Sequence, residues 1–343
     1  MAVQIALPYT RSEAKEWAKA SLKGVCNVVM PTFTADFKGL NEEAIKHDVR
    51  LCAQLGFSQT LLVSEGGTTF EEYLQFIEIA NDARPEGLGL VVHGSFNSVE
   101  ETIEAGRYAQ NHGGTALLLS YDPNFYPKSE DDVYEYTKRV SDSTDLGIIL
   151  FAVTTWGFAR LHPSQFPPRL VERMTDLETT IAVKYEANLP GLVTGMADVQ
   201  RRVGDKIIVS DPMEFNGPGW IDIYGMQWMG TSGYEYFGDR VPKWFNLLQE
   251  DKWDEAMEVY YSYAPARKAR GAVNTSVSAA KLLHRPAWKF MGWLQGFNGG
   301  PLRMPQMRLD GATMNSLREG LEKSGYDVTD EPNEAFFVGR NPR

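Results

Sequence analysis

GVCNVVMPTF, residues 24–33, is a short apolar run rich in β-branched residues, and a Pro-Thr-Phe segment ends it. The run is too short for a buried helix, and continuous apolarity is typical of a strand that is buried on both faces. Runs of the same kind recur at a fairly steady interval: QTLLVS at 59–64, LGLVVH at 88–93, TALLLS at 115–120, GIILFAV at 147–153, TIAVKY at 180–185, KIIVSD at 206–211 and, more weakly, MGTSGYEY at 229–236. Together they predict eight buried strands.

Signals for the start of a helix lie between these runs. TFEE at 69–72 and SVEE at 98–101 have the spacing of a capping box, and Ser129 precedes three acidic residues that favour the first turn of a helix. The alternation of strands and helices favours a (β/α)8 TIM barrel. A doubly wound open sheet stays possible, although no Gly-rich phosphate motif follows the first run.

The chain of 343 residues is long enough for one barrel and an extension. We expect a single domain, with residues 1–22 as a helical lead-in, residues 23–265 as the barrel, and residues 266–343 as C-terminal helices and a tail. No linker-like composition separates the last two parts.

The composition excludes several classes of protein. A net charge of −11 and the lack of a Lys/Arg cluster argue against nucleic acid as a partner. No run approaches the roughly 18 apolar residues of a membrane span, and the N-terminus lacks the apolar core of a signal peptide. Cys26 and Cys52 form no disulfide framework. We therefore expect a cytoplasmic protein with a small-molecule partner and no cofactor.

Residues at the C-terminal ends of barrel strands point toward the active site. Those positions hold polar and aromatic residues without an obvious triad: Thr32, Ser64, Glu65, Gly66, Gly67, His93, Ser120, Tyr121, Phe151, Thr154, Trp156, Lys184, Glu186, Ser210, Asp211, Tyr234, Glu235 and Tyr236. Lys184 stands out because it lies near the end of an otherwise apolar run. Burial favours the neutral amine, which attacks carbonyl carbons. The alternative is a lysine at the strand margin that reaches solvent or pairs with Glu186.

Several segments resemble dihydrodipicolinate synthase, N-acetylneuraminate lyase and related class I aldolases. Residues 24–57 are similar to the opening of these enzymes, 123–137 to the segment after their fourth strand, 181–187 to their Schiff-base lysine strand, and 299–309 to a late Gly–x–Arg–x–Pro segment. The resemblance spans about residues 22–325. It implies a barrel with a helical C-terminal extension, a homo-oligomer (tetramer or dimer), and Lys184 as the imine-forming residue.

The sequence departs from this family at the site. Phe151 stands where the family has a proton-shuttling tyrosine, Trp156 where the synthase has a carboxylate-binding arginine, and Asn124 at the place of an intersubunit tyrosine. The Gly-Thr-Thr-Gly-Glu loop of the family is represented by residues 64–69, with Glu65 where a hydroxyl donor is expected. Phenylalanine cannot transfer a proton, and a carboxylate repels another in a dry site. These changes argue against lysine biosynthesis and sialic acid cleavage.

Another group must then move protons. The candidates are His93, Glu65, Tyr121, Tyr126 and Glu186, with His93 the most natural near neutral pH. The alternative reading of His93 is a core histidine bonded to backbone. We expect substrate contacts from Ser64, Gly66, Gly67, Thr68, Tyr121, Phe151, Trp156, Asp211 and Tyr234. An aromatic wall around Trp156 resembles that of the hydratase-aldolases that cleave arylidene-pyruvates, although loop packing accounts for such rings equally well.

The sequence thus predicts a Schiff-base lyase that acts on a 2-oxo acid or a related carbonyl compound, and not a standard dihydrodipicolinate synthase. One alternative is a metal-dependent lyase or isomerase with His93, Glu65, Glu186, Asp211 and Glu235 around a divalent ion, although no HxH, HxxxH or DxD spacing supports a metal site. The other is a barrel that has lost catalysis and binds a ligand. A lysine inside an apolar strand opposes that second reading, because a leucine there would cost less.

Overall fold

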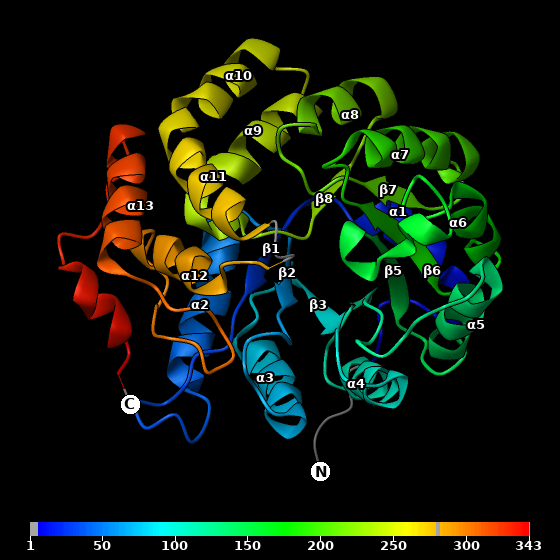
Figure 1. Cartoon of the computed structure of the whole chain (residues 1–343), viewed down its shortest axis with the longest axis horizontal. Helices are drawn as coiled ribbons and strands as arrows, with labels where there is room; N and C mark the ends of the chain where they lie inside the picture. Colours follow the sequence, from blue (N-terminus) through cyan, green and yellow to red (C-terminus); the bar gives the residue numbers. More distant parts are fainter. Residues whose placement is uncertain (1–5, 279–281, 343) are drawn as a thin grey trace. The chain divides into compact units, whose positions relative to one another are not determined.

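The computed structural model describes residues 6–278 and 282–342. Its parallel strands form one sheet in the order β7-β6-β5-β4-β3-β2-β1-β8 (Figure 1). The strands are β1 (Gly24–Val29), β2 (Gln59–Leu62), β3 (Gly89–Gly94), β4 (Ala116–Leu119), β5 (Gly147–Ala152), β6 (Thr180–Tyr185), β7 (Ile208–Ser210) and β8 (Trp228–Gly230). The first and last strands of this order also meet, because the Gly230 amide donates to Ser210 Oγ over 3.3 Å. The predicted (β/α)8 barrel is confirmed.

A helix follows every strand. These helices are α2 (Glu42–Gln54), α3 (Phe70–Ala83), α4 (Val99–Asn111), α5 (Glu130–Ser141), α6 (Pro168–Met174), α7 (Pro190–Val203), α8 (Gly217–Tyr224) and α9 (Arg240–Gln249). Helix α1 (Ala14–Ser21) precedes the barrel, and α10 (Trp253–Ser262), α11 (Ala264–Ser278), α12 (Arg285–Leu294) and α13 (Gly311–Lys323) follow it. Short 3₁₀ turns include η1 (Arg11–Glu13), η2 (Thr154–Trp156), η3 (Phe158–Arg160), η4 (Tyr234–Phe237) and η5 (Asn333–Phe337).

The predicted helix starts are confirmed. Thr69 caps α3 in a capping box with Glu72, and Ser129 caps α5 by accepting from the amide of Asp132. Ser98 caps α4 through the amide of Glu101. Each cap satisfies an amide at the first turn that has no partner within its own helix.

The eighth strand differs from the prediction. Strand β8 ends at Gly230, and residues 234–237 form the 3₁₀ turn η4 instead of continuing the strand. Gly233 allows this tight turn, because a Cβ there would lie 2.5 Å from the ring of Tyr236. As a result, Tyr234 lies on a turn rather than on a strand.

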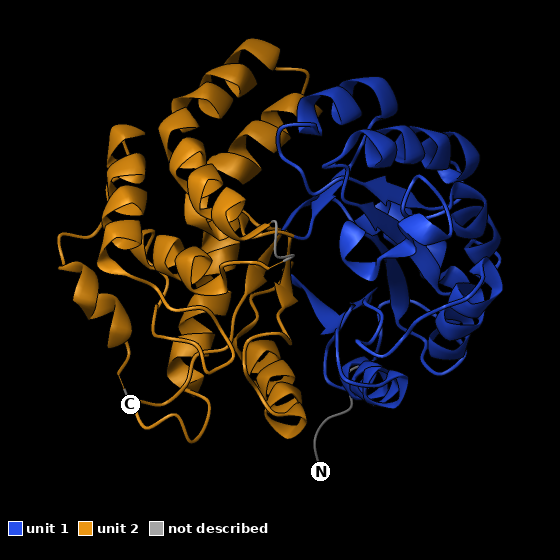
Figure 2. Cartoon of the chain, in the orientation of Figure 1, with its two compact units in different colours: residues 1–26, 89–231 blue, residues 27–88, 232–343 orange. Residues whose placement is uncertain are grey.

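The chain divides into two compact units (Figure 2). Unit 1 comprises residues 1–26 and 89–231, and unit 2 comprises residues 27–88 and 232–343. Unit 1 contains β3 to β8 with α1 and α4 to α8, whereas unit 2 contains β2, α2, α3 and α9 to α13. Within unit 2 every residue of α12 is buried. The sequence-based division at residues 22 and 265 stays a prediction.

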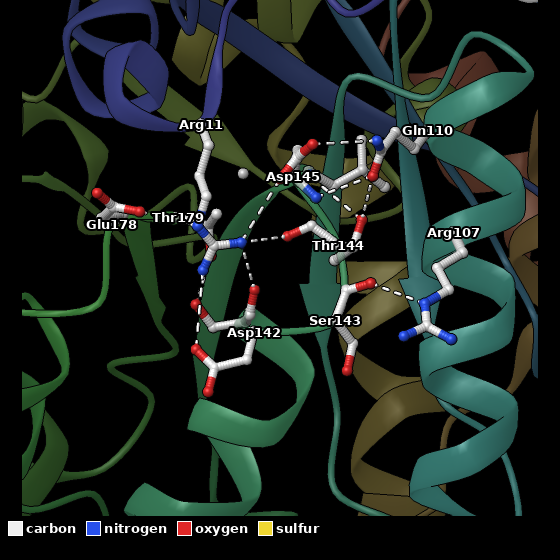
Figure 3. Close-up of polar contacts among 12 residues, drawn as sticks. Arg11, Arg107, Gln110, Asp142, Ser143, Thr144, Asp145, Glu178 and Thr179 are labelled. Carbon is white, nitrogen blue, oxygen red and sulfur yellow. Dashed lines mark hydrogen bonds and ion pairs between the residues drawn. The ribbon is translucent and has the colours of Figure 1, made fainter.

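Arg11 fixes the N-terminal segment at the amino ends of β5 and β6 (Figure 3). Its guanidinium donates to the carbonyl oxygens of Ser141 and Thr144 over 2.9 and 3.0 Å, and it pairs with Glu178 at 2.8 Å. Asp145 lies 3.6 Å from the same guanidinium. Because these contacts hold the amino ends of the two strands together, they support the strand pair that carries Lys184 at its other end.

Candidate active site

Lys184 lies on β6, which is buried along its whole length, and only 5% of the residue is exposed. Parallel pairing places Lys184 beside Phe151 of β5 and beside Ser210 of β7. The amine Nζ lies 3.9 Å from the centre of the Phe151 ring and donates a hydrogen bond of 3.2 Å to Thr231 Oγ1. The lysine thus lies between an aromatic face and a hydroxyl group inside unit 1.

Glu186, the predicted alternative partner of the lysine, lies beyond the end of β6. Its carboxylate accepts a hydrogen bond from the Asn188 side chain over 3.4 Å. The residue is half-buried, whereas Lys184 is buried. The structure therefore places Lys184 inside the strand and Glu186 in the following loop.

Phe151, Trp156 and Tyr121 form one aromatic cluster in unit 1. The indole Nε1 of Trp156 donates to the carbonyl oxygen of Phe151 over 2.6 Å, and the two rings meet edge to face. Tyr121 meets Trp156 edge to face at 5.8 Å and stacks on Phe125 at 5.4 Å. Phe151 and Trp156 are half-buried, so parts of their rings stay accessible.

The hydroxyl group of Tyr121 points away from this cluster toward α5. It forms a hydrogen bond of 3.0 Å with Thr137 Oγ1, and burial raises the pKa of the phenol. A phenol with a raised pKa and a partner in a helix is a poor proton carrier. These contacts favour a packing role for Tyr121.

His93 and Ser120 form a buried pair at the ends of β3 and β4. His93 Nε2 lies 3.2 Å from Ser120 Oγ, and both residues are buried in unit 1. A hydroxyl partner can pass a proton, so the pair has the composition of a proton relay.

Asp211 connects the loops after β6 and β7. Its carboxylate accepts hydrogen bonds from the amides of Ala187 and Met213, from Asn216 Nδ2 and from Trp220 Nε1, at 2.8 to 3.3 Å. Burial nevertheless raises the pKa of Asp211 to about 6. Four donors occupy the carboxylate, so the contacts favour loop support over direct binding of a substrate.

The segment Ser64–Thr69 follows β2 in unit 2, and two glycines shape it. A Cβ at Gly66 would lie 2.4 Å from Pro31, and one at Gly67 would lie 2.8 Å from Arg303. Gly67 also has a φ of +90°, which favours glycine. Thr68 Oγ1 lies 3.5 Å from the Ser64 carbonyl. The glycines are therefore required by close packing.

Glu65, in the same segment, forms an ion pair. Its carboxylate accepts from Arg285 Nη2 over 2.9 Å, and its carbonyl oxygen accepts from Gln306 Nε2 over 2.7 Å. The Arg285 guanidinium lies 4.7 Å from the centre of the Trp288 ring. Glu65 is therefore paired with a cation.

A small cavity in unit 2 brings further charged residues together. It is lined by Glu235, Lys289, Asp48 and Trp288, and its volume of about 20 Å³ leaves room for about one water. Burial raises the pKa of Glu235 to about 8 and lowers the pKa of Lys289 to about 7. Lys289 Nζ donates to the Pro31 carbonyl over 2.8 Å and to Thr32 Oγ1 over 2.9 Å.

Tyr234, another predicted site residue, is 2% exposed and lies on η4 in unit 2. Sequence reasoning missed Thr231, Arg285 and Lys289. The sequence did point to Arg285 and Lys289, because a helix with the sequence RPAWKFMGWL places Arg and Lys four residues apart, on one face. No sequence pattern marked Thr231.

In the described part of the chain, no three His, Cys, Asp or Glu side chains come together in a way that could hold a metal ion. Within residues 6–278 and 282–342, no helix is both long and apolar enough to cross a membrane. Cys26 and Cys52 are buried and form no disulfide.

Known proteins share this architecture. The chain is 24% identical over 309 residues to 4-hydroxy-tetrahydrodipicolinate synthase of Methanothrix thermoacetophila, covering 86% of this chain and 96% of that one. A structure of PhdJ bound to a substrate intermediate superposes with a TM-score of 0.75 at 13% identity, covering 92% of this chain and 97% of PhdJ. N-acetylneuraminate lyase from Fusobacterium nucleatum gives 0.71 at 18% identity, covering 88% and 98%. At these identities the two structures establish the fold alone.

The model of the Dihydrodipicolinate synthetase family matches residues 22–261, more than half of the chain. A match of this extent establishes the family, which the low pairwise identities cannot do. The chain belongs to the Dihydrodipicolinate synthetase family.

Proposed function

We propose that this protein is a class I lyase that forms a Schiff base between Lys184 and a 2-oxo acid or a related carbonyl compound. Members of the family are Schiff-base lyases of the aldolase type. The observation that carries the proposal is the buried amine of Lys184, 3.9 Å from the Phe151 ring and 3.2 Å from the Thr231 hydroxyl.

The chemistry follows from a buried primary amine. The nitrogen lone pair forms a bond to the carbonyl carbon, the oxygen takes up a proton, and the nitrogen gives up one of its own protons, which yields a neutral carbinolamine. Loss of water, for which the leaving hydroxyl takes a second proton, gives a protonated imine. The imine nitrogen then accepts the electron pair of a neighbouring C–C or C–H bond. Cleavage or addition at carbon, and loss or addition of water, become accessible from that state.

The aromatic face of Phe151 supports the charged intermediate. A cation over the face of a ring gains about 0.5–2 kcal/mol, the larger value when both groups are desolvated. The protonated imine carries its positive charge at the Lys184 nitrogen, so the same ring contact is available to it. Phenylalanine thus replaces the family tyrosine with a group that stabilises charge and transfers no proton.

Proton transfer falls to other groups. We assign it to the His93–Ser120 pair, because imidazole changes its charge near neutral pH and the hydroxyl extends its reach. Thr231 orients the amine, since its hydroxyl accepts the hydrogen bond that Lys184 Nζ donates. Glu65 stays a candidate, but its ion pair with Arg285 favours a role in binding.

The proposed substrate has an apolar or aromatic part beside its carbonyl group. The half-buried rings of Phe151 and Trp156 support this, because the synthase has a tyrosine and an arginine at these places. For the same reason we do not assign standard dihydrodipicolinate synthase activity. Ser64, Gly66, Gly67 and Thr68 stay candidate contacts to the substrate.

We also propose a homo-oligomer, a tetramer or dimer. Members of the family are typically oligomeric. Unit 1 exposes large apolar side chains at the start of α7 and within it, on α8 and in the loop before α8: Leu189, Val193, Phe215, Ile223 and Tyr224, with Phe215 60% and Ile223 68% exposed. A second copy of the chain would cover this surface. Light scattering tests this, and Ile223→Asp should lower the mass toward that of the monomer.

Reduction with borohydride tests the imine. Incubation with pyruvate or a 4-aryl-2-oxo-3-butenoate and then borohydride should inactivate the protein, whereas borohydride alone should not. Lys184→Ala should reduce turnover to background and keep the far-UV circular dichroism and thermal transition of a folded chain. Unchanged turnover in a folded Lys184→Ala variant would exclude the proposed mechanism.

A further inference from the structure

Two polar groups at the wall of the small cavity in unit 2 have no hydrogen-bond partner among the residues that the structure describes. They are the carboxyl group of Glu235, with both of its oxygens, and the indole Nε1 of Trp288. Glu235 is 3% exposed and Trp288 is 5% exposed, so both are almost fully shielded from bulk water. Buried polar groups are normally paired, so two unpaired groups at one cavity point to an occupant of that cavity.

The other polar groups near Glu235 do not satisfy its carboxyl group. The backbone of Val28 and the side chain of Asn27 lower its pKa, but neither makes a hydrogen bond of normal geometry with it. The remaining charged groups of the cavity wall are already engaged. Asp48 accepts a hydrogen bond from a backbone amide over 2.6 Å, and the amine of Lys289 makes two hydrogen bonds to the turn after β1.

The cavity restricts its occupant by size and by hydrogen-bonding chemistry. A volume of about 20 Å³ fits one water and nothing larger. The indole N–H of Trp288 only donates, so the occupant must accept a hydrogen bond. Neither a metal ion nor ammonium accepts one, and the Lys289 amine at the same wall opposes a second cation. Water accepts from the indole and also suits the carboxyl group of Glu235, whether that group carries its proton or not.

We propose that this cavity is the binding site of a single internal water, which accepts a hydrogen bond from Trp288 Nε1 and forms another with the Glu235 carboxyl group. The water joins η4 to α12, since Glu235 lies on the first and Trp288 on the second. It gives both buried groups the partner that they lack among the side chains, which is the usual role of internal water. The site involves no covalent step and does not depend on an imine at Lys184.

A high-resolution crystal structure of the full chain tests the site directly. We expect one peak of density in the cavity, roughly 2.7–3.2 Å from Trp288 Nε1 and at hydrogen-bonding distance from a Glu235 oxygen. A cavity without density overturns the proposal, as does a peak that lies out of reach of the indole nitrogen. A peak whose anomalous signal identifies a metal ion would also overturn it.

Gly292→Ala tests the site in solution, because the sign of its effect depends on the occupant. Gly292 lies in α12 at the cavity wall, and a Cβ there would lie 3.7 Å from Glu235 Cγ and from the Phe297 ring, which is ordinary contact. In a cavity without water the methyl group fills space and removes a helical glycine, which raises Tm. If the methyl group displaces a water, Glu235 and Trp288 lose their partner. We therefore expect Tm to fall by roughly 2–5 °C.

Gly271→Ala is the matched control. Gly271 also lies within a helix, α11, and a Cβ there would project into open space. This variant should raise Tm slightly through helix propensity alone. Oxygen-17 magnetic relaxation dispersion, which counts long-lived internal waters, should detect one fewer in Gly292→Ala than in the parent and no change in Gly271→Ala. A rise of Tm in Gly292→Ala, or the same number of internal waters in all three proteins, would overturn the proposal.

Discussion

Lys184 in unit 1 and Lys289 in unit 2 are each 5% exposed, yet their amines have different surroundings. The amine of Lys184 faces the Phe151 ring and donates a hydrogen bond to the Thr231 hydroxyl. The amine of Lys289 donates to a backbone carbonyl and to Thr32, and Asp48 acts on it electrostatically. In our proposal, burial alone therefore does not make a nucleophile. The kind of group that faces the amine distinguishes the proposed imine-forming lysine from a lysine that holds a turn in place.

The largest effect on stability is expected from Lys289→Met. The variant loses two hydrogen bonds to the turn after β1 and removes one of the cations that act on the buried Asp48. We expect a loss of roughly 2–5 kcal/mol in the free energy of unfolding, measured with denaturant. Lys38→Met is the control and should change it by less than about 0.5 kcal/mol. An equally stable Lys289→Met would show that this amine does not hold the turn.

A pH-dependent effect is expected at Glu235. In the folded chain the Glu235 carboxyl group keeps its proton up to about pH 8, whereas the ordinary pKa of a glutamate is 4.5. Between these two pH values the folded state therefore binds more protons than the unfolded state. The free energy of unfolding should therefore fall as pH rises through that window. Glu235→Gln removes the ionisation and should be more stable than the parent at pH 8 by roughly 2–4 kcal/mol. Parallel stability curves for the two proteins from pH 5 to pH 8 would contradict this account of the cavity.

A smaller effect, on rate, is expected at Thr231. Thr231→Val removes the acceptor of the Lys184 hydrogen bond and keeps the shape of the side chain. We expect kcat to fall on the order of 10-fold while KM changes little, and Thr231→Ser to restore most of the rate. Steady-state kinetics of the three proteins measures this. A rise in KM at constant kcat would mean that Thr231 binds substrate instead.

The smallest effect is expected from Phe151→Tyr. The new phenol would supply a proton-transferring group beside Lys184. We expect a gain of a few-fold, roughly 2- to 5-fold, in the rate of borohydride-dependent inactivation with pyruvate. Phe151→Leu is the matched control, because it removes the ring and adds no proton donor. It should slow inactivation through loss of the cation–π contact.

The sequence predicted the barrel and the buried lysine because both depend on local patterns. Continuous apolar runs mark the strands, and a charge within one run marks Lys184. The predicted end of β8 was wrong, because the run contains two glycines and its sequence gives little indication of where the strand stops. The Glu65–Arg285 pair joins positions 220 residues apart, and no local pattern reports such a contact. The hydroxyl group of Thr231 was missed for the same reason.

The position of the trapped adduct tests the central claim most directly. After incubation with pyruvate and borohydride, peptide mapping by mass spectrometry should find the reduced adduct on the peptide that contains Lys184 and none on the peptide that contains Lys289. The second buried lysine serves as an internal control, because burial lowers the pKa of its amine and so also favours the neutral form. An adduct on Lys289, on both lysines equally, or on neither with every carbonyl compound tried would contradict the account.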